Sequence, residues 1–163
     1  MDRIARGQFA VFTRNHRVHL DEAILLCSAD PSRQVTFRAS GTWASAERAV
    51  ESGPPLPLYI AAIGGSAVVE YVAELCEVQT RPHRGDPKTE RLLRLWTDST
   101  KDEGLWEKYG KQVRTLYVLS KCRAVRRPFP ISHLTKAVDA TPVSADFRYS
   151  YALVLPIPEA VVV

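Results

Sequence analysis

The sequence has few residues that could form a disulfide or hold a metal. Its three cysteines, Cys27, Cys76 and Cys122, are far apart, form no CxxC pair and are odd in number, so we interpret them as buried free thiols. Two of the four histidines, His16 and His19, are three residues apart but belong to no zinc-binding motif. The sequence therefore predicts neither a metal site nor a cofactor.

Long apolar runs are also missing. No stretch approaches the roughly 20 residues of a membrane helix. The opening residues, MDRIARGQFAVF, carry charges and lack the apolar core of a signal peptide. We therefore expect a cytoplasmic protein with no membrane partner.

Signatures of common catalytic and nucleotide-binding sites are absent too. There is no GxGxxG, Walker loop, GxSxG or HExxH, and the double glycine Gly64-Gly65 is expected to turn a hairpin instead of cradling phosphate. Cys122 with His133 would be a conceivable nucleophile and base, but nothing else in the sequence supports that pair. We therefore expect a binding module without catalytic residues.

The composition suits one domain over residues 1–163, with 45% hydrophobic and 25% charged residues. The net charge is +4, and six basic residues without any acid lie between Lys111 and Arg127. Such a run favours binding to a polyanion. The alternative is a strand edge that charges protect from association.

Hydrophobic periodicity predicts short strands and helices in alternation. Strands are expected at 8–13, 33–40, 58–65, 66–80, 114–125 and 147–157, and helical segments at 19–29, 42–52, 89–99, 102–112 and 131–138. The order lacks regular βαβ units. We therefore expect an α+β domain built on a small mixed or antiparallel β-barrel, with short helices packed around it.

Trp43 is surrounded by small and polar residues in the segment SGTWASAERA. A tryptophan of the core usually has branched aliphatic neighbours. We interpret Trp43 as a flat wall at the start of a helix, where small neighbours leave room for a ligand.

Four segments, in order, resemble the YTH domain of the PUA-like superfamily, which also contains the EVE and ASCH domains. They are GQFAVFTRNH, SGTWASAERA, SAVVEYVAELCEV and CRAVRRPFPISHLTKA, and together they cover residues 8–155. YTH domains hold a flipped N6-methyladenine of single-stranded nucleic acid in an aromatic cage. The resemblance implies the same barrel and the same task here, in which stacking contributes about 1–3 kcal/mol per base.

The resemblance also implies roles for individual residues. Trp43 would be the first cage wall and Trp106 the second, with Trp96 and Tyr109 as alternatives, although Trp96 also fits the apolar face of a helix. The implied contacts to the base edge and backbone come from Thr13, Arg14, Asn15, His16, Ala44 and Ser45. The implied phosphate contacts come from Lys121, Arg123, Arg126 and Arg127.

One departure from the family leaves other functions open. No Asn or Asp occupies the position that reads the adenine edge, where the sequence has HRVH, so Asn15 or His16 would have to replace it. An EVE-like reader of modified cytosine remains an alternative. An ASCH-like RNA-processing amidohydrolase is another, with Lys121 beside Glu70 or Glu74, and a protein-interaction domain is a fourth.

The expected partner is methylated DNA or RNA. Prokaryotic domains of this kind serve methyl-directed restriction and defence systems, and any cleavage would need a nuclease or motor domain or a partner protein.

Overall fold

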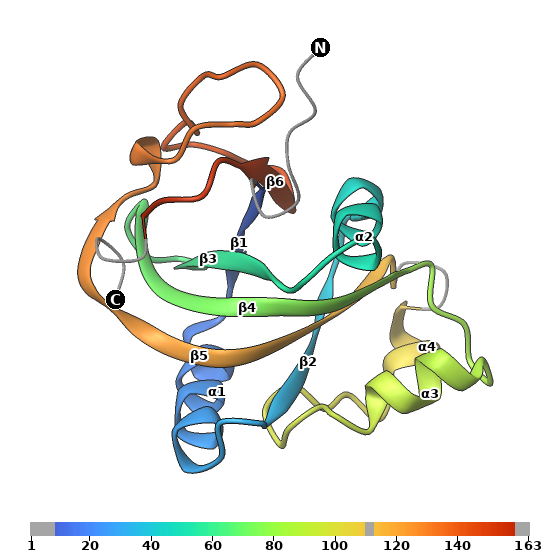
Figure 1. The fold of residues 1–163 in the computed structure, drawn as a ribbon. Coiled ribbons are helices and arrows are strands. Elements are labelled where there is room, and N and C mark those ends of the chain that lie inside the picture. The colour runs from blue at the N-terminus through green and yellow to red at the C-terminus, as the bar shows by residue number, and fades with distance from the viewer. Residues whose placement is uncertain (1–8, 110–112, 159–163) are drawn as a thin grey trace.

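One mixed sheet forms the centre of the molecule (Figure 1). This computed structural model describes residues 9–109 and 113–158. The sheet has the order β2-β5-β4-β3-β1-β6, in which β1 runs parallel to β3 and the other neighbours are antiparallel. The strands are β1 (Ala10–Asn15), β2 (Gln34–Ala39), β3 (Leu56–Ala62), β4 (Val68–Thr80), β5 (Thr115–Pro130) and β6 (Tyr151–Val154).

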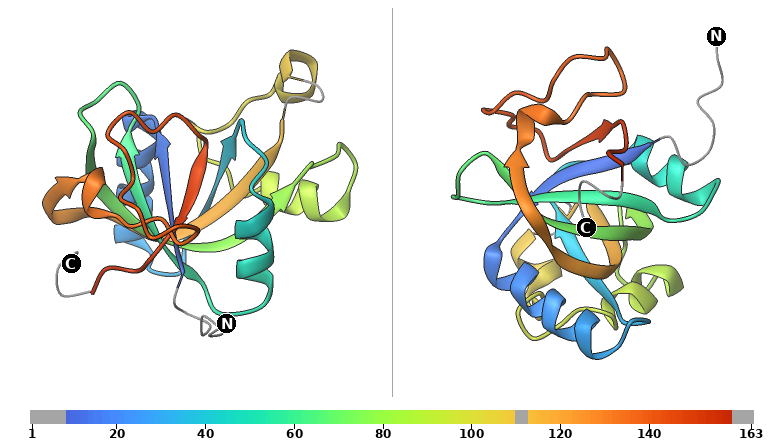
Figure 2. Two further views of the ribbon diagram at one scale, coloured as in Figure 1. Left: turned by 90° about the horizontal axis from the view of Figure 1, so that it is seen from above. Right: turned by 60° about the vertical axis from the view of Figure 1, so that its left-hand side comes forward.

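The sheet is strongly bent, because β4 and β5 are long and curve around the shorter strands (Figure 2). The pairing of β4 with β5 shifts register at three places along its length. Such bulges increase the local twist and bend of a strand. The bend brings residues from distant parts of the sequence onto one inner face.

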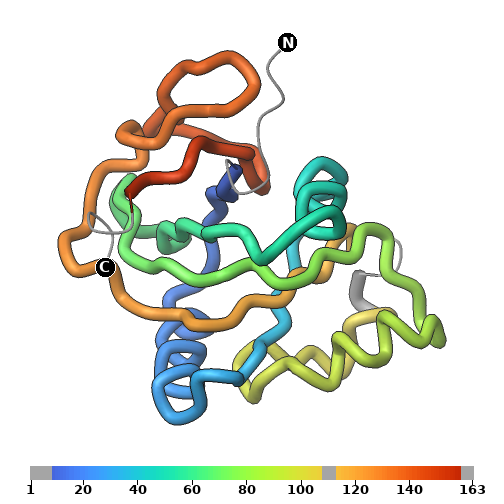
Figure 3. Tube along the Cα trace, in the orientation of Figure 1, coloured from blue at the N-terminus to red at the C-terminus, as the bar shows by residue number. Residues whose placement is uncertain are grey.

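Short helices cover this sheet. They are α1 (Arg17–Ala29), α2 (Ala44–Glu51), α3 (Pro87–Leu93), α4 (Leu105–Tyr109) and the 3-10 turn η2 (Ile131–His133). Helix α1 packs against β5 and α2 against β4. Figure 3 shows α3 and α4 together on one side of the molecule, and η2 on the other. Within the described ranges, no helix has the length and apolarity needed to cross a membrane.

The strands at the centre are buried on both faces. Successive residues of a strand point to opposite faces, and Val11 and Phe12 accordingly belong to different hydrophobic clusters, as do Leu58 and Tyr59. Strands buried on both faces read as nearly continuous apolar runs, which explains the sequence AVF in β1 and LYIAA in β3.

The α+β class, the order of the elements and the hairpin at Gly64-Gly65 are confirmed. Gly64 has a φ of 77°, a conformation that glycine adopts without strain. The helical segments predicted at 89–99 and 131–138 are shorter than expected and end at Leu93 and His133. Three further boundaries were wrong. Helix α1 begins at Arg17, two residues before the predicted start at residue 19. Strand β5 runs through to Pro130. Strand β2 pairs with β5 only as far as Ser120, so the residues of β5 after Ser120 lie on an edge, where a proline without an amide donor is tolerated.

The third difference concerns the last strand. The alternation over residues 147–157 predicted one long strand, but β6 contains only Tyr151–Val154. Residues 147–150 therefore belong to the loop that precedes β6, and this loop forms part of the candidate site.

Candidate functional site

A cavity of about 1080 Å³ opens beside the carboxyl end of β1. Its size is at the upper end of the range of small-molecule sites, about 300–1,000 Å³. The walls come from the β1–α1 junction, from β2, from the β3–β4 hairpin and from the loop before β6. Four residues predicted to border a bound base line this cavity together: Thr13, Arg14, Asn15 and His16.

The charge of the cavity is strongly positive. Arg14, Arg38, Arg114 and Arg148 line it, and Asp146 is the one acid among its lining residues in the described ranges. The Nη1 atom of Arg38 also lies 3.6 Å from the Oδ2 atom of Asp102, which forms an ion pair with it. A recess with this balance attracts phosphate groups, since several cations raise the local concentration of anions.

The loop that precedes β6 is tied to β1 and to itself. Arg14 donates from Nη2 to the carbonyl of Ala145 at 3.4 Å, and Thr13 donates from its hydroxyl to the carbonyl of Ser150 at 2.7 Å. Within the loop, the Ser144 hydroxyl donates to the Asp146 carboxylate, which is the main reason that the pKa of Asp146 is lowered.

Two polar groups meet on the inner wall of the cavity. The Asn15 amide donates from Nδ2 to the Tyr117 hydroxyl at 2.6 Å, and its Oδ1 accepts from the backbone N–H of His16 at 2.7 Å. Burial raises the pKa of Tyr117 well above its usual range, so the phenol stays protonated. Both residues are buried, Tyr117 completely, so this pair supports the cavity wall from behind.

A pair of histidines completes this side of the cavity. His16 and His19 form an edge-to-face contact with centroids 5.5 Å apart, and His19 also contacts Phe37 at 6.3 Å. Burial, and secondly the neighbouring His16, lower the pKa of His19. Its Nδ1 is buried and has no hydrogen-bond partner in the part of the chain that the structure describes.

Trp43 does not form the open wall that the sequence predicted. Its side chain is fully buried, with Tyr117 stacked on it at 4.3 Å and Tyr151 at 5.1 Å between ring centroids. The indole Nε1 donates to the hydroxyl of Ser150 at 2.8 Å. Trp43 is thus a core residue that anchors the loop before β6, and the prediction of an exposed cage wall was wrong.

The small residues around Trp43 were predicted to leave room for a ligand, but the structure gives a different reason for them. A Cβ added to Gly41 would lie 2.5 Å from the Cβ of Ser150, so the glycine makes room for the protein's own loop, not for a ligand. Ala44 and Ser45 lie in the first turn of α2 and do not line the cavity. Ser45 instead forms a 2.6 Å hydrogen bond with the Tyr151 hydroxyl.

The candidates for a second cage wall lie elsewhere. Trp96 and Trp106 pack against a separate cluster that includes Leu92 and Leu105. Helix α3 ends at Leu93, and the carbonyl of Leu95 then accepts from the backbone N–H of Thr36 in β2. Trp96 borders a space of about 10 Å³, which is no larger than a single water requires. The structure therefore does not bring Trp96 and Trp106 to the cavity, and the side chain of Tyr109 lies outside the described residues.

The aromatic side chains that do line the cavity were missed as site residues. They are Phe37, Tyr117, Phe147 and Tyr149. Two of them stand in FRYS, where aromatic and basic residues alternate. That combination, read as a nucleic-acid signal instead of a strand, would have pointed to the loop.

The basic residues predicted to contact phosphate lie further along β5 and do not line the cavity. Lys121 pairs with Glu74 at 3.6 Å, and Arg123 donates to the carbonyl of Lys121 at 3.2 Å. Arg126 and Arg127 are exposed near the end of the strand. The structure therefore does not bring these four residues together with Thr13–His16.

Of the pairs considered for catalysis, the structure brings together Lys121 and Glu74, whose charged groups lie 3.6 Å apart. Lys121 and Glu74 form a largely exposed surface pair, and Glu70 binds Arg17 instead. Burial raises the pKa of the Cys122 thiol to about 12, so Cys122 is not a ready nucleophile.

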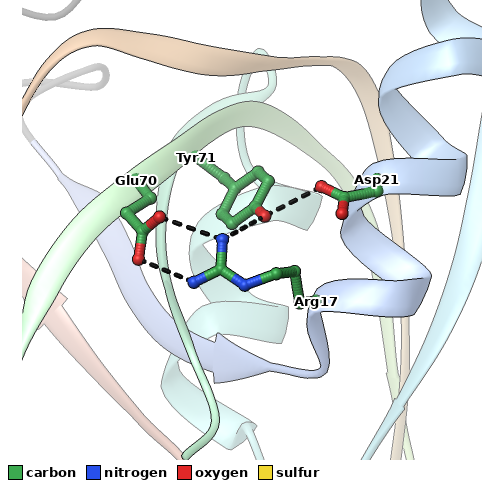
Figure 4. Close-up of polar contacts among 4 residues, drawn as sticks. All are labelled: Arg17, Asp21, Glu70 and Tyr71. Carbon is green, nitrogen blue, oxygen red and sulfur yellow. Dashed lines mark hydrogen bonds and ion pairs between the residues drawn. The ribbon is translucent and has the colours of Figure 1, made fainter. Parts of the chain in front are cut away.

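A polar network holds α1 on β4 next to the cavity (Figure 4). Arg17 donates to both carboxylate oxygens of Glu70 and to the Tyr71 hydroxyl, each at 3.0 Å, and that hydroxyl donates to Asp21 at 2.9 Å. Burial and then Asp21 raise the pKa of Tyr71 to about 12. Since Arg17 follows directly after His16, the network fixes the turn that lines the cavity.

No protein-family model matches this sequence, and a search of curated proteins found no relative.

Proposed function

We propose that this chain binds single-stranded nucleic acid and accepts one base in the cavity beside β1. The observation that carries the proposal is the composition of that cavity, where four arginines line one space of about 1080 Å³ together with the partly exposed Phe147 and the exposed Tyr149, while Phe37 and Tyr117 are buried behind it. Arginines neutralise phosphates, and aromatic rings stack on bases with about 1–3 kcal/mol per base.

The inner wall offers groups suited to the edge of a base. Asn15 and the Tyr117 hydroxyl are joined by a 2.6 Å hydrogen bond, and Asn15, which keeps a small exposed fraction, is the one of the two that can meet a base edge. Asn15 and Tyr117 are both buried. A base whose edge does not match this wall would leave polar groups unpaired there.

We further propose that the base is modified, most simply N6-methyladenine, and that the curved sheet is a PUA-like barrel. The support is the resemblance of four sequence segments to YTH domains, together with the bent mixed sheet. Burying one methyl group contributes about 0.8 kcal/mol, roughly a fourfold preference before any gain in stacking. Modified cytosine is the alternative base, and a nuclease or motor partner would act on the bound DNA or RNA.

Fluorescence anisotropy with short DNA and RNA strands tests this function. The probes are single- and double-stranded and carry adenine, N6-methyladenine or 5-methylcytosine at one position. We expect the tightest binding to single strands with N6-methyladenine and a marked decrease of affinity with salt. A preference for methylcytosine would replace the YTH-like assignment by the EVE-like one, and the absence of salt-dependent binding to every probe would contradict the proposal.

Variants locate the phosphate contacts. Replacing Arg114 or Arg148 by alanine should reduce the slope of log affinity against log salt by roughly 0.7 for each phosphate that the variant no longer neutralises. Arg48, exposed on α2 and outside the cavity, is the charge-matched control. Equal effects of Arg48→Ala and the cavity variants would argue against the cavity as the binding site.

A further inference from the structure

We infer that Tyr149 is a stacking platform for the base next to the one in the cavity, so that the site takes a strand and not a free nucleoside or nucleotide. This inference rests on the proposed function. Its starting point is that Tyr149 lines the cavity and is nevertheless 81% exposed. It is the one exposed Phe, Tyr or Trp in the part of the chain that the structure describes.

The ring of Tyr149 has one tilted aromatic neighbour among the described residues and is otherwise largely exposed. Its ring contact is with Phe147, at 5.6 Å between centroids and an angle of 59°. A tilted contact of this kind does not cover the face as a parallel stack would. Phe147 in turn packs edge-to-face on the buried Phe12 at 5.8 Å, so the core supports the position of Tyr149.

The backbone on the other side of Tyr149 is also fixed. The neighbouring Ser150 accepts from the Thr13 hydroxyl at its carbonyl, at 2.7 Å, and from the Trp43 indole at its hydroxyl, at 2.8 Å. A platform that is already ordered loses little conformational freedom when a ligand binds, which favours affinity.

The surroundings of Tyr149 match a nucleic-acid strand. Arg148 precedes it and lines the same cavity, where it can reach a phosphate of the chain that enters the site. Ile63, on the β3–β4 hairpin, is 49% exposed and lines the cavity as well. An exposed aromatic next to a cation, at the rim of a basic recess, suits a stacked base and its phosphate.

The test compares two ligands on one set of variants. The ligands are N6-methyladenosine 5′-monophosphate and a five-nucleotide single strand with one central N6-methyladenine, both measured by calorimetry. Tyr149→Ala should weaken binding of the strand about 5- to 150-fold, the equivalent of about 1–3 kcal/mol for one stacked base. Binding of the monophosphate should stay unchanged.

Two further variants serve as controls. Tyr149→Phe keeps the ring and should bind the strand like the wild type. Val138→Ala, 87% exposed and outside the cavity, should change neither affinity. Because Tyr149 is so exposed, thermal unfolding of Tyr149→Ala should match that of the wild type.

Three results would overturn the inference, and they are distinguishable. Strand binding by Tyr149→Ala at wild-type affinity would refute the platform while leaving the proposed function intact. An equal loss for the strand and the monophosphate would make Tyr149 a wall of the base pocket itself. Failure of the wild-type protein to bind any strand would remove the proposed function, and the platform with it.

Discussion

Replacing Trp43 by alanine distinguishes a core residue from a wall that waits for a ligand. The side chain is fully buried and contacts two tyrosines. Truncating a buried tryptophan to alanine costs about 3–5 kcal/mol of the free energy of unfolding. Domains have a total of about 5–15 kcal/mol, so Trp43→Ala should lose a large part of its stability, about 3–5 kcal/mol.

Urea denaturation followed by circular dichroism measures this loss directly. Trp43→Phe is the matched variant: it keeps an aromatic ring between the tyrosines, loses the hydrogen bond to Ser150, and should fall between the alanine variant and the wild type. Binding is a poor readout here, because Trp43 also anchors the loop that lines the cavity. If Trp43→Ala stays within about 1 kcal/mol of wild-type stability, its loss is well below the cost of a core truncation. If the same variant has also lost strand binding, the reasoning is refuted and Trp43 is restored as a ligand wall.

Three other perturbations test the neighbouring parts of the structure. Gly41→Ala places a Cβ 2.5 Å from that of Ser150. It should lower the free energy of unfolding in urea by about 1–3 kcal/mol and weaken strand binding. A neutral effect would mean that the loop is free to shift. Tyr71→Phe removes a buried hydroxyl with two charged partners and should lower the free energy of unfolding by about 1–3 kcal/mol. Glu70→Gln changes a partly exposed ion pair and should lower it by less than about 1 kcal/mol. The reverse order in the same assay would contradict the network. The pKa of His19 is lowered from 6.5 in the folded protein, so the unfolded chain binds the proton first as pH falls. The free energy of unfolding should therefore decrease below about pH 6.5, and His19→Gln should flatten that decrease.

Local patterns allowed much of the sheet to be predicted from the sequence. Alternating apolar residues marked β1 and β2, and the double glycine marked the hairpin between β3 and β4. The polar residues at the end of β1 were predicted to border a ligand, and they line the cavity. In each case the signal lies within a few neighbouring residues, which is the range over which periodicity and turn chemistry act.

The role of Trp43 could not be predicted in this way. Its burial depends on Tyr117 and Tyr151, which reach it only after the sheet bends and β6 pairs with β1. The loop at 147–150 was hidden for a related reason. Its alternation imitates a strand, but β1 pairs with β6 only at Tyr151–Val154, so the residues before Tyr151 have no partner strand in the described sheet.

The most direct test of the account is to map where a bound strand touches the protein. A single-stranded probe with a photoreactive base at the modified position would be crosslinked to the wild-type chain, and the attached peptides identified by mass spectrometry. We predict crosslinks at residues 13–16, 19, 37–40 and 145–150, which line the cavity. Crosslinks confined to the basic stretch 121–127 of β5, with none at the cavity, would contradict the proposed site.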